Sequence, residues 1–124
     1  MNAFGSLVSI VDDDESVRES LPDLVREFGF AVQSFTSAEE FLTSGWVART
    51  ECLILDVAMP GMTGPELQHE LARRGQPIPV VFITAHRDGA DRVPLLEQGA
   101  VECLLKPFSD AELRDALGLV FGPY

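Results

Sequence analysis

Short apolar runs alternate with amphipathic segments along the whole chain. The apolar runs have the length of strands and cover Leu7–Val11, Phe30–Phe35, Cys52–Asp56, Val80–Ile83 and Val101–Leu105. Segments with apolar residues at helical spacing follow them, at about residues 15–28, 37–42, 64–75, 89–98 and 109–122. This alternation is typical of βαβ units, in which helices connect buried parallel strands. The pattern predicts an α/β fold, with a doubly wound five-stranded parallel sheet in the order 2-1-3-4-5 and five helices.

Turn and cap residues support the predicted helix boundaries. Two pairs have the spacing of a capping box, Ser37 with Glu40 and Ser109 with Glu112. Pro65 suits the first position of the third helix. Proline has no N–H to donate, and an N–H at that position has no acceptor within the helix. The fourth helix, about Gly89–Gln98, contains Pro94 and begins at a glycine. We expect it to be the loosest element of the fold.

Four of the five predicted strands end on a side chain that can do chemistry. These side chains are Asp12 to Asp14, Asp56, Thr84 and Lys106. The carboxyl ends of parallel strands share one edge of the sheet, and the first and third strands are neighbours in this strand order. We therefore expect the first acidic cluster to meet Asp56, with Thr84 beside them. Lys106 starts about 10 Å from Asp56, two strand spacings away, which a lysine side chain can largely span.

The residue types at this edge predict a phosphoryl site. Clustered carboxylates repel one another unless a cation neutralises them. Oxygen ligands without His or Cys select a hard ion, and Mg²⁺ is the usual one when phosphate is present. We expect Asp56 to be the nucleophile, Lys106 and Mg²⁺ to neutralise charge on the transferred group, and Thr84 to donate to one of its oxygens. In this prediction Lys106 faces a cleft and serves signalling more than folding.

Composition limits the class of protein. The chain has 124 residues, which suits a single domain over residues 1–124. Its 20 acidic and nine basic residues give a net charge of −11, which argues against a nucleic-acid surface. No apolar run is long enough for a membrane span, and the first residues do not read as a signal peptide. Cys52 and Cys103 lie in apolar runs, so we expect buried, reduced thiols in a cytoplasmic protein.

The chain resembles the receiver domain of two-component response regulators. Four motifs carry the resemblance: Val11-Asp12-Asp13-Asp14, Leu55-Asp56-Val57-Ala58-Met59-Pro60 with Gly64, Ile83-Thr84-Ala85, and Lys106-Pro107-Phe108. Each motif alone is weak, but their order and their positions at strand ends are specific, and together they cover essentially the whole chain. The segments at residues 13–18 and 106–108 look most like the nitrogen-fixation regulator branch.

The resemblance implies a signalling switch. Its phosphoryl donor would be a sensor histidine kinase or a phosphotransfer protein, and the domain would catalyse only its own phosphorylation and dephosphorylation. Asp13 would bind Mg²⁺ directly and Asp12 largely through water, with the carbonyl of Ala58 as a further ligand. Asp14 lies just past the strand, so we expect it to be the N-cap of the first helix and not a ligand. The Lys106-Pro107 peptide would be cis. The signal would leave through the face formed by the fourth helix, the fifth strand and the fifth helix, which also pairs into homodimers.

Cys103 departs from the family pattern. Three residues before the lysine the family usually has Tyr or Phe, which swings inward when the threonine moves toward the phosphoryl group. A thiol cannot make the same swing or bury the same area. We therefore expect the movement of Thr84 to be coupled to the output face differently.

Two alternative functions remain open from the sequence. A phosphohydrolase of the haloacid-dehalogenase type also uses an aspartyl nucleophile and Mg²⁺, but it needs a second Asp at the position of Ala58. An adaptor of the same fold that takes no phosphate is the other alternative. The two histidines are expected outside the chemistry, with His86 in a loop at the rim of the site and His69 exposed on a helix.

Overall fold

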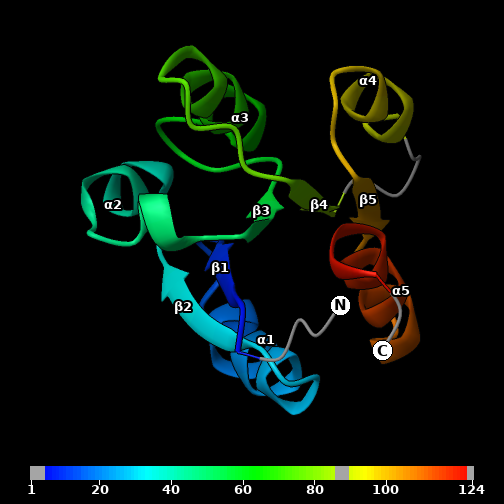
Figure 1. Cartoon of the computed structure of the whole chain (residues 1–124). Coiled ribbons are helices and arrows are strands. Elements are labelled where there is room, and N and C mark those ends of the chain that lie inside the picture. Colours follow the sequence, from blue (N-terminus) through cyan, green and yellow to red (C-terminus); the bar gives the residue numbers. More distant parts are fainter. Residues whose placement is uncertain (1–4, 86–89, 123–124) are drawn as a thin grey trace.

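The five strands of the chain form one parallel sheet. The computed structural model describes residues 5–85 and 90–122. The strands are β1 (Leu7–Val11), β2 (Ala31–Phe35), β3 (Cys52–Asp56), β4 (Val80–Thr84) and β5 (Glu102–Leu105). Their order across the sheet is β2-β1-β3-β4-β5, and every neighbouring pair is parallel (Figure 1). The predicted fold class and strand order are confirmed.

Helices cover both faces of the sheet. They are α1 (Glu15–Glu27), α2 (Ala38–Thr43), α3 (Gly64–Arg73), α4 (Arg92–Glu97) and α5 (Asp110–Phe121), with a short 3-10 helix at Val47–Arg49. Helices α1 and α5 pack on one face, and α2, α3 and α4 pack on the other (Figure 1). None of the helices within the described residues is long and apolar enough to cross a membrane.

Alternating side chains along each strand divide the core into two layers. The layer under α1 and α5 contains Ile10, Ile54, Ile83 and Leu104. The layer under α2, α3 and α4 contains Val11, Leu55, Phe82 and Cys103. Because side chains alternate with a period of two, the residue two positions after a strand residue falls on the same side of the sheet. This alternation assigns Asp12, Asp56 and Lys106 to the α1 and α5 side and Thr84 to the α4 side.

The ends of α2 and α5 show how far the capping prediction holds. At α5, Ser109 and Glu112 form the predicted reciprocal capping box. At α2, Ser37 accepts the backbone N–H of Glu40, but the Glu40 carboxylate accepts the N–H of Thr36 instead of that of Ser37. The predicted box at α2 is therefore only half formed, and the second bond ties the helix to the preceding turn.

The starts of α3 and α4 differ from the prediction. Helix α3 begins at Gly64, one residue before Pro65, and has a capping box between Thr63 and Glu66 that the sequence analysis missed. Helix α4 is shorter than predicted, because it begins only at Arg92. Gly89 and His86 lie outside the described residues, so the predictions that concern them cannot be compared with the structure.

Candidate functional site

Three carboxylates meet at the carboxyl edge of β1 and β3. One oxygen of each of Asp12, Asp13 and Asp56 lies within 4.8 Å of the others. The pairing of Val11 with Leu55 brings the next residues of the two strands, Asp12 and Asp56, side by side. Asp12 and Asp56 are buried and Asp13 is exposed. An all-oxygen donor set that opens to solvent on one side fits a hard divalent cation such as Mg²⁺.

Burial and charge repulsion make Asp56 an unusual carboxyl group. Burial, followed by repulsion from Asp12, raises the pKa of Asp56 to about 7, although attraction by Lys106 opposes the rise. A proton, a cation or both must therefore offset the negative charge of the cluster near neutral pH. The excess negative charge of the cluster is consistent with a site that a bound cation would stabilise.

Lys106 reaches the cluster from the end of β5. Its Nζ donates to Oδ2 of Asp12 at 2.9 Å and lies 3.7 Å from Oδ1 of Asp56. Burial lowers the pKa of Lys106, but the hydrogen bond to Asp12 and the two carboxylates raise it on balance. The reach predicted for the lysine is confirmed. Because the side chain of Asp12 is fully buried, Lys106 is also a structural counter-ion, a role that the sequence analysis had not given it.

Replacing Lys106 by Met should lower the free energy of unfolding of the ion-free protein by about 1–3 kcal/mol, because Asp12 loses its counter-ion. Added Mg²⁺ should recover part of the loss. Urea unfolding at pH 7.5 with EDTA and then with Mg²⁺ measures both effects. Arg92→Met is the control, since it removes a half-exposed cation whose pairing with Glu102 is worth less than about 1 kcal/mol. Equal stability of Lys106→Met and wild type in EDTA would contradict this role.

Asp14 stands apart from the three carboxylates. It is the N-cap of α1, as predicted, and its side chain accepts from the backbone and hydroxyl of Ser16. These hydrogen bonds lower the pKa of Asp14. Its own N–H donates to Oδ1 of Asp12 at 2.9 Å. Asp14 therefore orients Asp12 and starts the helix, and it is not part of the cluster.

The loop after β3 is held close to Asp56 by backbone contacts. The N–H of Gly64 donates to the carbonyl of Val57 at 3.1 Å. A Cβ added at Gly64 would overlap the carbonyl oxygen of Asp56 and touch the ring of Phe82. Ala58, the predicted source of a carbonyl ligand, is exposed in this loop. Gly64 was expected at the start of the third helix, but its close approach to Asp56 was not predicted, because only the packing of α3 on β3 creates it.

A carboxylate from α2 also fixes this loop. Oε2 of Glu39 accepts the N–H of Met62 at 3.0 Å, across 23 residues of sequence. A long-range side-chain contact of this kind leaves no local signal in the sequence. Glu39 therefore ties α2 to the loop that carries Ala58.

Thr84 lies at the end of β4, as predicted, but its hydroxyl points to an unexpected partner. The side chain is buried, and Oγ1 donates to Oδ2 of Asp91 at 3.0 Å. Asp91 is the N-cap residue of α4. The sequence did not mark Asp91 as a cap, because Asp91 lies inside the helix predicted over about residues 89–98, whereas α4 begins only at Arg92.

The two cysteines are buried, as predicted. Cys52 lies on β3, and burial raises the pKa of its thiol to about 12. Cys103 packs in the core layer that also contains Leu95 and Ala100. Burial, with a smaller effect of Asp91, raises the pKa of the Cys103 thiol to about 11. Both thiols are therefore poor nucleophiles.

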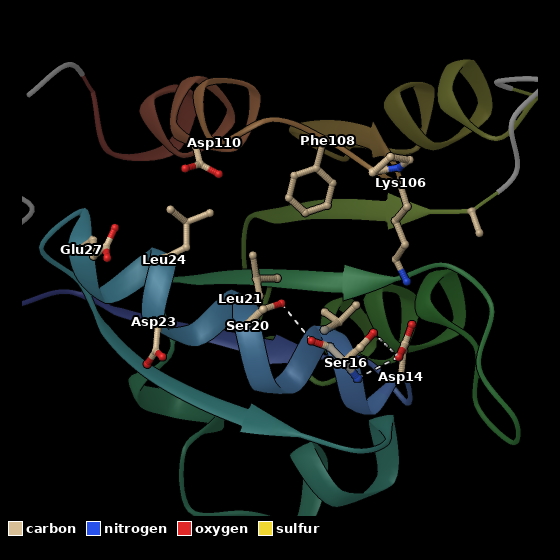
Figure 2. Close-up of a pocket in the computed structure, with 13 residues that line it drawn as sticks. Asp14, Ser16, Ser20, Leu21, Asp23, Leu24, Glu27, Lys106, Phe108 and Asp110 are labelled. Atoms are coloured by element: carbon tan, nitrogen blue, oxygen red, sulfur yellow. Dashed lines mark hydrogen bonds between the residues drawn. The ribbon is translucent and has the colours of Figure 1, made fainter.

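An open groove of about 780 Å³ adjoins the cluster between α1 and the segment at residues 106–110. Figure 2 shows Lys106 at one end of this groove and Glu27 near the other. Apolar side chains such as Leu24 and Phe108 line it, and four carboxylates surround them, those of Asp14, Asp23, Glu27 and Asp110. The groove offers a mixed apolar and acidic surface directly beside Lys106.

Comparison with known proteins identifies a family for the chain. The family model described as the response regulator receiver domain matches residues 8–118. Nodulation protein W of Bradyrhizobium diazoefficiens is 46% identical over 112 residues, which are 90% of this chain and 49% of that protein. The transcriptional regulatory protein FixJ of Azorhizobium caulinodans is 41% identical over 115 residues, 93% of this chain and 54% of that protein. The chain thus spans about half the length of the curated relatives it matches.

Solved structures agree with this assignment. A crystal structure of FixJ-N superposes with a TM-score of 0.82 at 36% identity and covers 97% of this chain and 94% of that one. The structure of the response regulator StyR gives a TM-score of 0.83 at 46% identity over 92% of this chain and 58% of that one. The resemblance to response regulators of the nitrogen-fixation type is confirmed.

Proposed function

Because the chain belongs to the response regulator receiver domain family, we propose that it is a phosphorylation-dependent switch of a two-component system, with Asp56 as the phosphoacceptor. The observation that carries this assignment is the meeting of Asp12, Asp13 and Asp56 at one strand edge, with Lys106 beside them. We assign residues 1–124 to one receiver domain. A phosphohydrolase of the haloacid-dehalogenase type finds no support, since Ala58 stands where its second carboxylate is needed.

The transfer uses the carboxylate of Asp56 as nucleophile. One of its oxygens forms a bond to phosphorus while the bond from phosphorus to the donor's histidine nitrogen breaks, and the electron pair of that bond stays on the nitrogen. Lys106, 3.7 Å from Asp56, neutralises negative charge on the phosphoryl oxygens. The hydroxyl of Thr84 donates a hydrogen bond to one of these oxygens.

The three carboxylates are the proposed ligands of Mg²⁺. Asp13, Asp12 and Asp56 would supply carboxylate oxygens, Asp12 through water, and Ala58 would supply its carbonyl. The mutual approach of the three carboxylates within 4.8 Å and the raised pKa of Asp56 support a cation at this place. When bound, the ion supplies positive charge that lowers the repulsion between Asp56 and the incoming phosphoryl group. Asp12 keeps its contact with Lys106 and so holds the ammonium near Asp56.

The groove beside Lys106 is the proposed docking surface for the phosphoryl donor, a sensor histidine kinase or a phosphotransfer protein. It lies next to the cluster and combines apolar and acidic side chains. Such a surface suits a partner that offers apolar and basic side chains. The donor's histidine would then reach Asp56 past Lys106.

The signal leaves through the face formed by α4, β5 and α5. This face exposes three large apolar side chains, those of Val93, Leu105 and Leu119. Exposed apolar side chains on one face suit a protein partner, and a second copy of the chain is the proposed one.

Apart from its own phosphorylation and dephosphorylation the domain catalyses no reaction, and it acts in the cytoplasm without binding nucleic acid itself.

Incubation with acetyl phosphate and Mg²⁺ should add one phosphoryl group to the wild type and none to Asp56→Asn. Intact-mass spectrometry measures the product, and EDTA should abolish it, because the carboxylate cluster repels the donor when no cation is bound. Glu19→Gln is the matched control, since it makes the same chemical change at an exposed position of α1. Labelling of Asp56→Asn to the wild-type extent would contradict the assignment.

A further inference from the structure

The proton of the Thr84 hydroxyl already has an acceptor in this structure. Oγ1 of Thr84 donates to Oδ2 of Asp91 at 3.0 Å, and a carboxylate offers only acceptors, so the proton belongs to the hydroxyl. A hydroxyl has one proton to donate. The bond to Asp91 and the proposed bond to a phosphoryl oxygen therefore compete for the same proton.

The bond to Asp91 also keeps Thr84 on the far side of the sheet from Asp56. Phe82, two residues before Thr84, packs in the layer under α2, α3 and α4. Ile54, two residues before Asp56, packs in the layer under α1 and α5. Alternation along the strands thus starts the Thr84 side chain on the α4 side, where Asp91 lies. The Thr84 side chain therefore has to turn to the other side of the sheet before its hydroxyl can bond to a phosphoryl oxygen on Asp56.

The geometry at the start of helix α4 favours the hydrogen bond from Thr84 to Asp91. Asp91 occupies the N-cap position but makes no side-chain bond to the backbone of the helix. An N-cap carboxylate usually accepts from the second or third helical N–H. The third position here is Pro94, which has no N–H. The helix therefore competes weakly for the carboxylate that accepts from Thr84.

We propose that Asp91 is a positioning residue that holds the Thr84 hydroxyl toward α4 until a phosphoryl oxygen on Asp56 accepts its hydrogen bond instead. The inference rests on the proposed function, because it assumes that Thr84 donates to the phosphoryl group. When the Thr84 hydroxyl leaves Asp91, the N-cap residue of α4 loses a hydrogen bond. The next residue, Arg92, pairs with Glu102 of β5 at 2.8 Å. The competition for one proton thereby links the phosphorylation site to the face of α4 and β5.

The affinity for Mg²⁺-beryllofluoride, a mimic of the phosphoryl group, tests the competition. We would measure it by calorimetry in wild type, Asp91→Ala, Thr84→Val and the double variant. Asp91→Ala should bind the mimic about tenfold more tightly than wild type, because a hydrogen bond to a charged group no longer has to break. In the Thr84→Val background the same change should alter affinity less than about twofold.

The four proteins also separate this inference from other roles of Asp91. Equal tightening in both backgrounds would show that Asp91 acts through its charge alone, and weaker binding by Asp91→Ala would show that it supports the bound state. Either result overturns the proposal.

Urea unfolding of the same four proteins without Mg²⁺ provides a test that does not depend on phosphorylation. It should show a coupling between Thr84 and Asp91 of about tenfold in the unfolding equilibrium constant. Absence of this coupling would overturn the positioning role by itself. If the coupling is present but wild type binds no mimic, the proposed function has failed while the Thr84–Asp91 contact stands, and the competition for a phosphoryl group is ruled out.

Discussion

Replacing Asp56 by Asn is expected to stabilise the ion-free protein against unfolding at pH 8 by about 2–4 kcal/mol. The pKa of Asp56 is raised from 3.8 to about 7, first by burial and then by Asp12. Each unit of pKa difference between the folded and unfolded chain corresponds to about 1.4 kcal/mol. Asn keeps the shape of the side chain but removes the charge that the fold disfavours.

The sign of the pH dependence follows from where the proton is held. The folded chain keeps the Asp56 proton up to about pH 7 and the unfolded chain releases it near pH 3.8, so the contribution of Asp56 to stability falls as pH rises between these values. The gap between Asp56→Asn and wild type should therefore widen by about 2 kcal/mol from pH 5 to pH 8. Urea unfolding in EDTA at the two pH values measures the gap.

The exposed carboxylate of Glu19 provides the control for this experiment. Glu19→Gln should change the free energy of unfolding by less than about 0.5 kcal/mol at both pH values. Added Mg²⁺ should stabilise the wild type more than Asp56→Asn, because the variant lacks one carboxylate of the cluster. A gap that is the same at pH 5 and pH 8 would show that the fold does not disfavour the Asp56 charge.

Gly64→Ala is expected to destabilise the protein by about 3 kcal/mol or more and to weaken Mg²⁺ binding. A Cβ at this position would overlap the carbonyl oxygen of Asp56, which is backbone and cannot move aside as a flexible side chain can. The start of α3 or the end of β3 must shift, at a cost typical of an overpacked core. Urea unfolding and a Mg²⁺ titration measure the two losses.

Gly118→Ala is the matched control for the same substitution. Gly118 lies within α5, and a Cβ there would meet nothing within 4 Å. Alanine is favoured over glycine in a helix by about 0.5–1 kcal/mol, so Gly118→Ala should stabilise the protein slightly. Equal and small effects of the two substitutions would show that the approach of α3 to Asp56 is not tight.

Local sequence patterns predicted the strands and most helix ends. The strand order followed from the alternation of strands and helices, and it placed Asp12 beside Asp56. Asp14 was correctly separated from the cluster, because a carboxylate at the start of a helix has a local role as a cap. Signals of this kind act over three or four residues, which is why the sequence shows them.

Contacts between distant elements were not predictable in the same way. The pairing of Glu39 with the N–H of Met62 depends on how α2 packs beside β3. The Thr84–Asp91 bond depends on which way a strand-end side chain turns, and the sequence analysis had pointed Thr84 only at the phosphoryl group. Lys106 lines a groove, as expected, but its role as a structural counter-ion was not predicted, because that role depends on the full burial of Asp12.

The phosphoryl group is expected to reside on Asp56. After treatment with acetyl phosphate and Mg²⁺, reduction with borohydride converts an aspartyl phosphate to homoserine, and peptide mass spectrometry locates the changed residue. The structure predicts homoserine at position 56 and at no other position. Both carboxylate oxygens of Asp12 already accept hydrogen bonds, from the N–H of Asp14 and from Nζ of Lys106, and Asp13 is exposed. Asp56 is buried and lies 3.7 Å from Lys106. Homoserine at Asp12 or Asp13, or phosphorylation that leaves Asp56 unmodified, would contradict it.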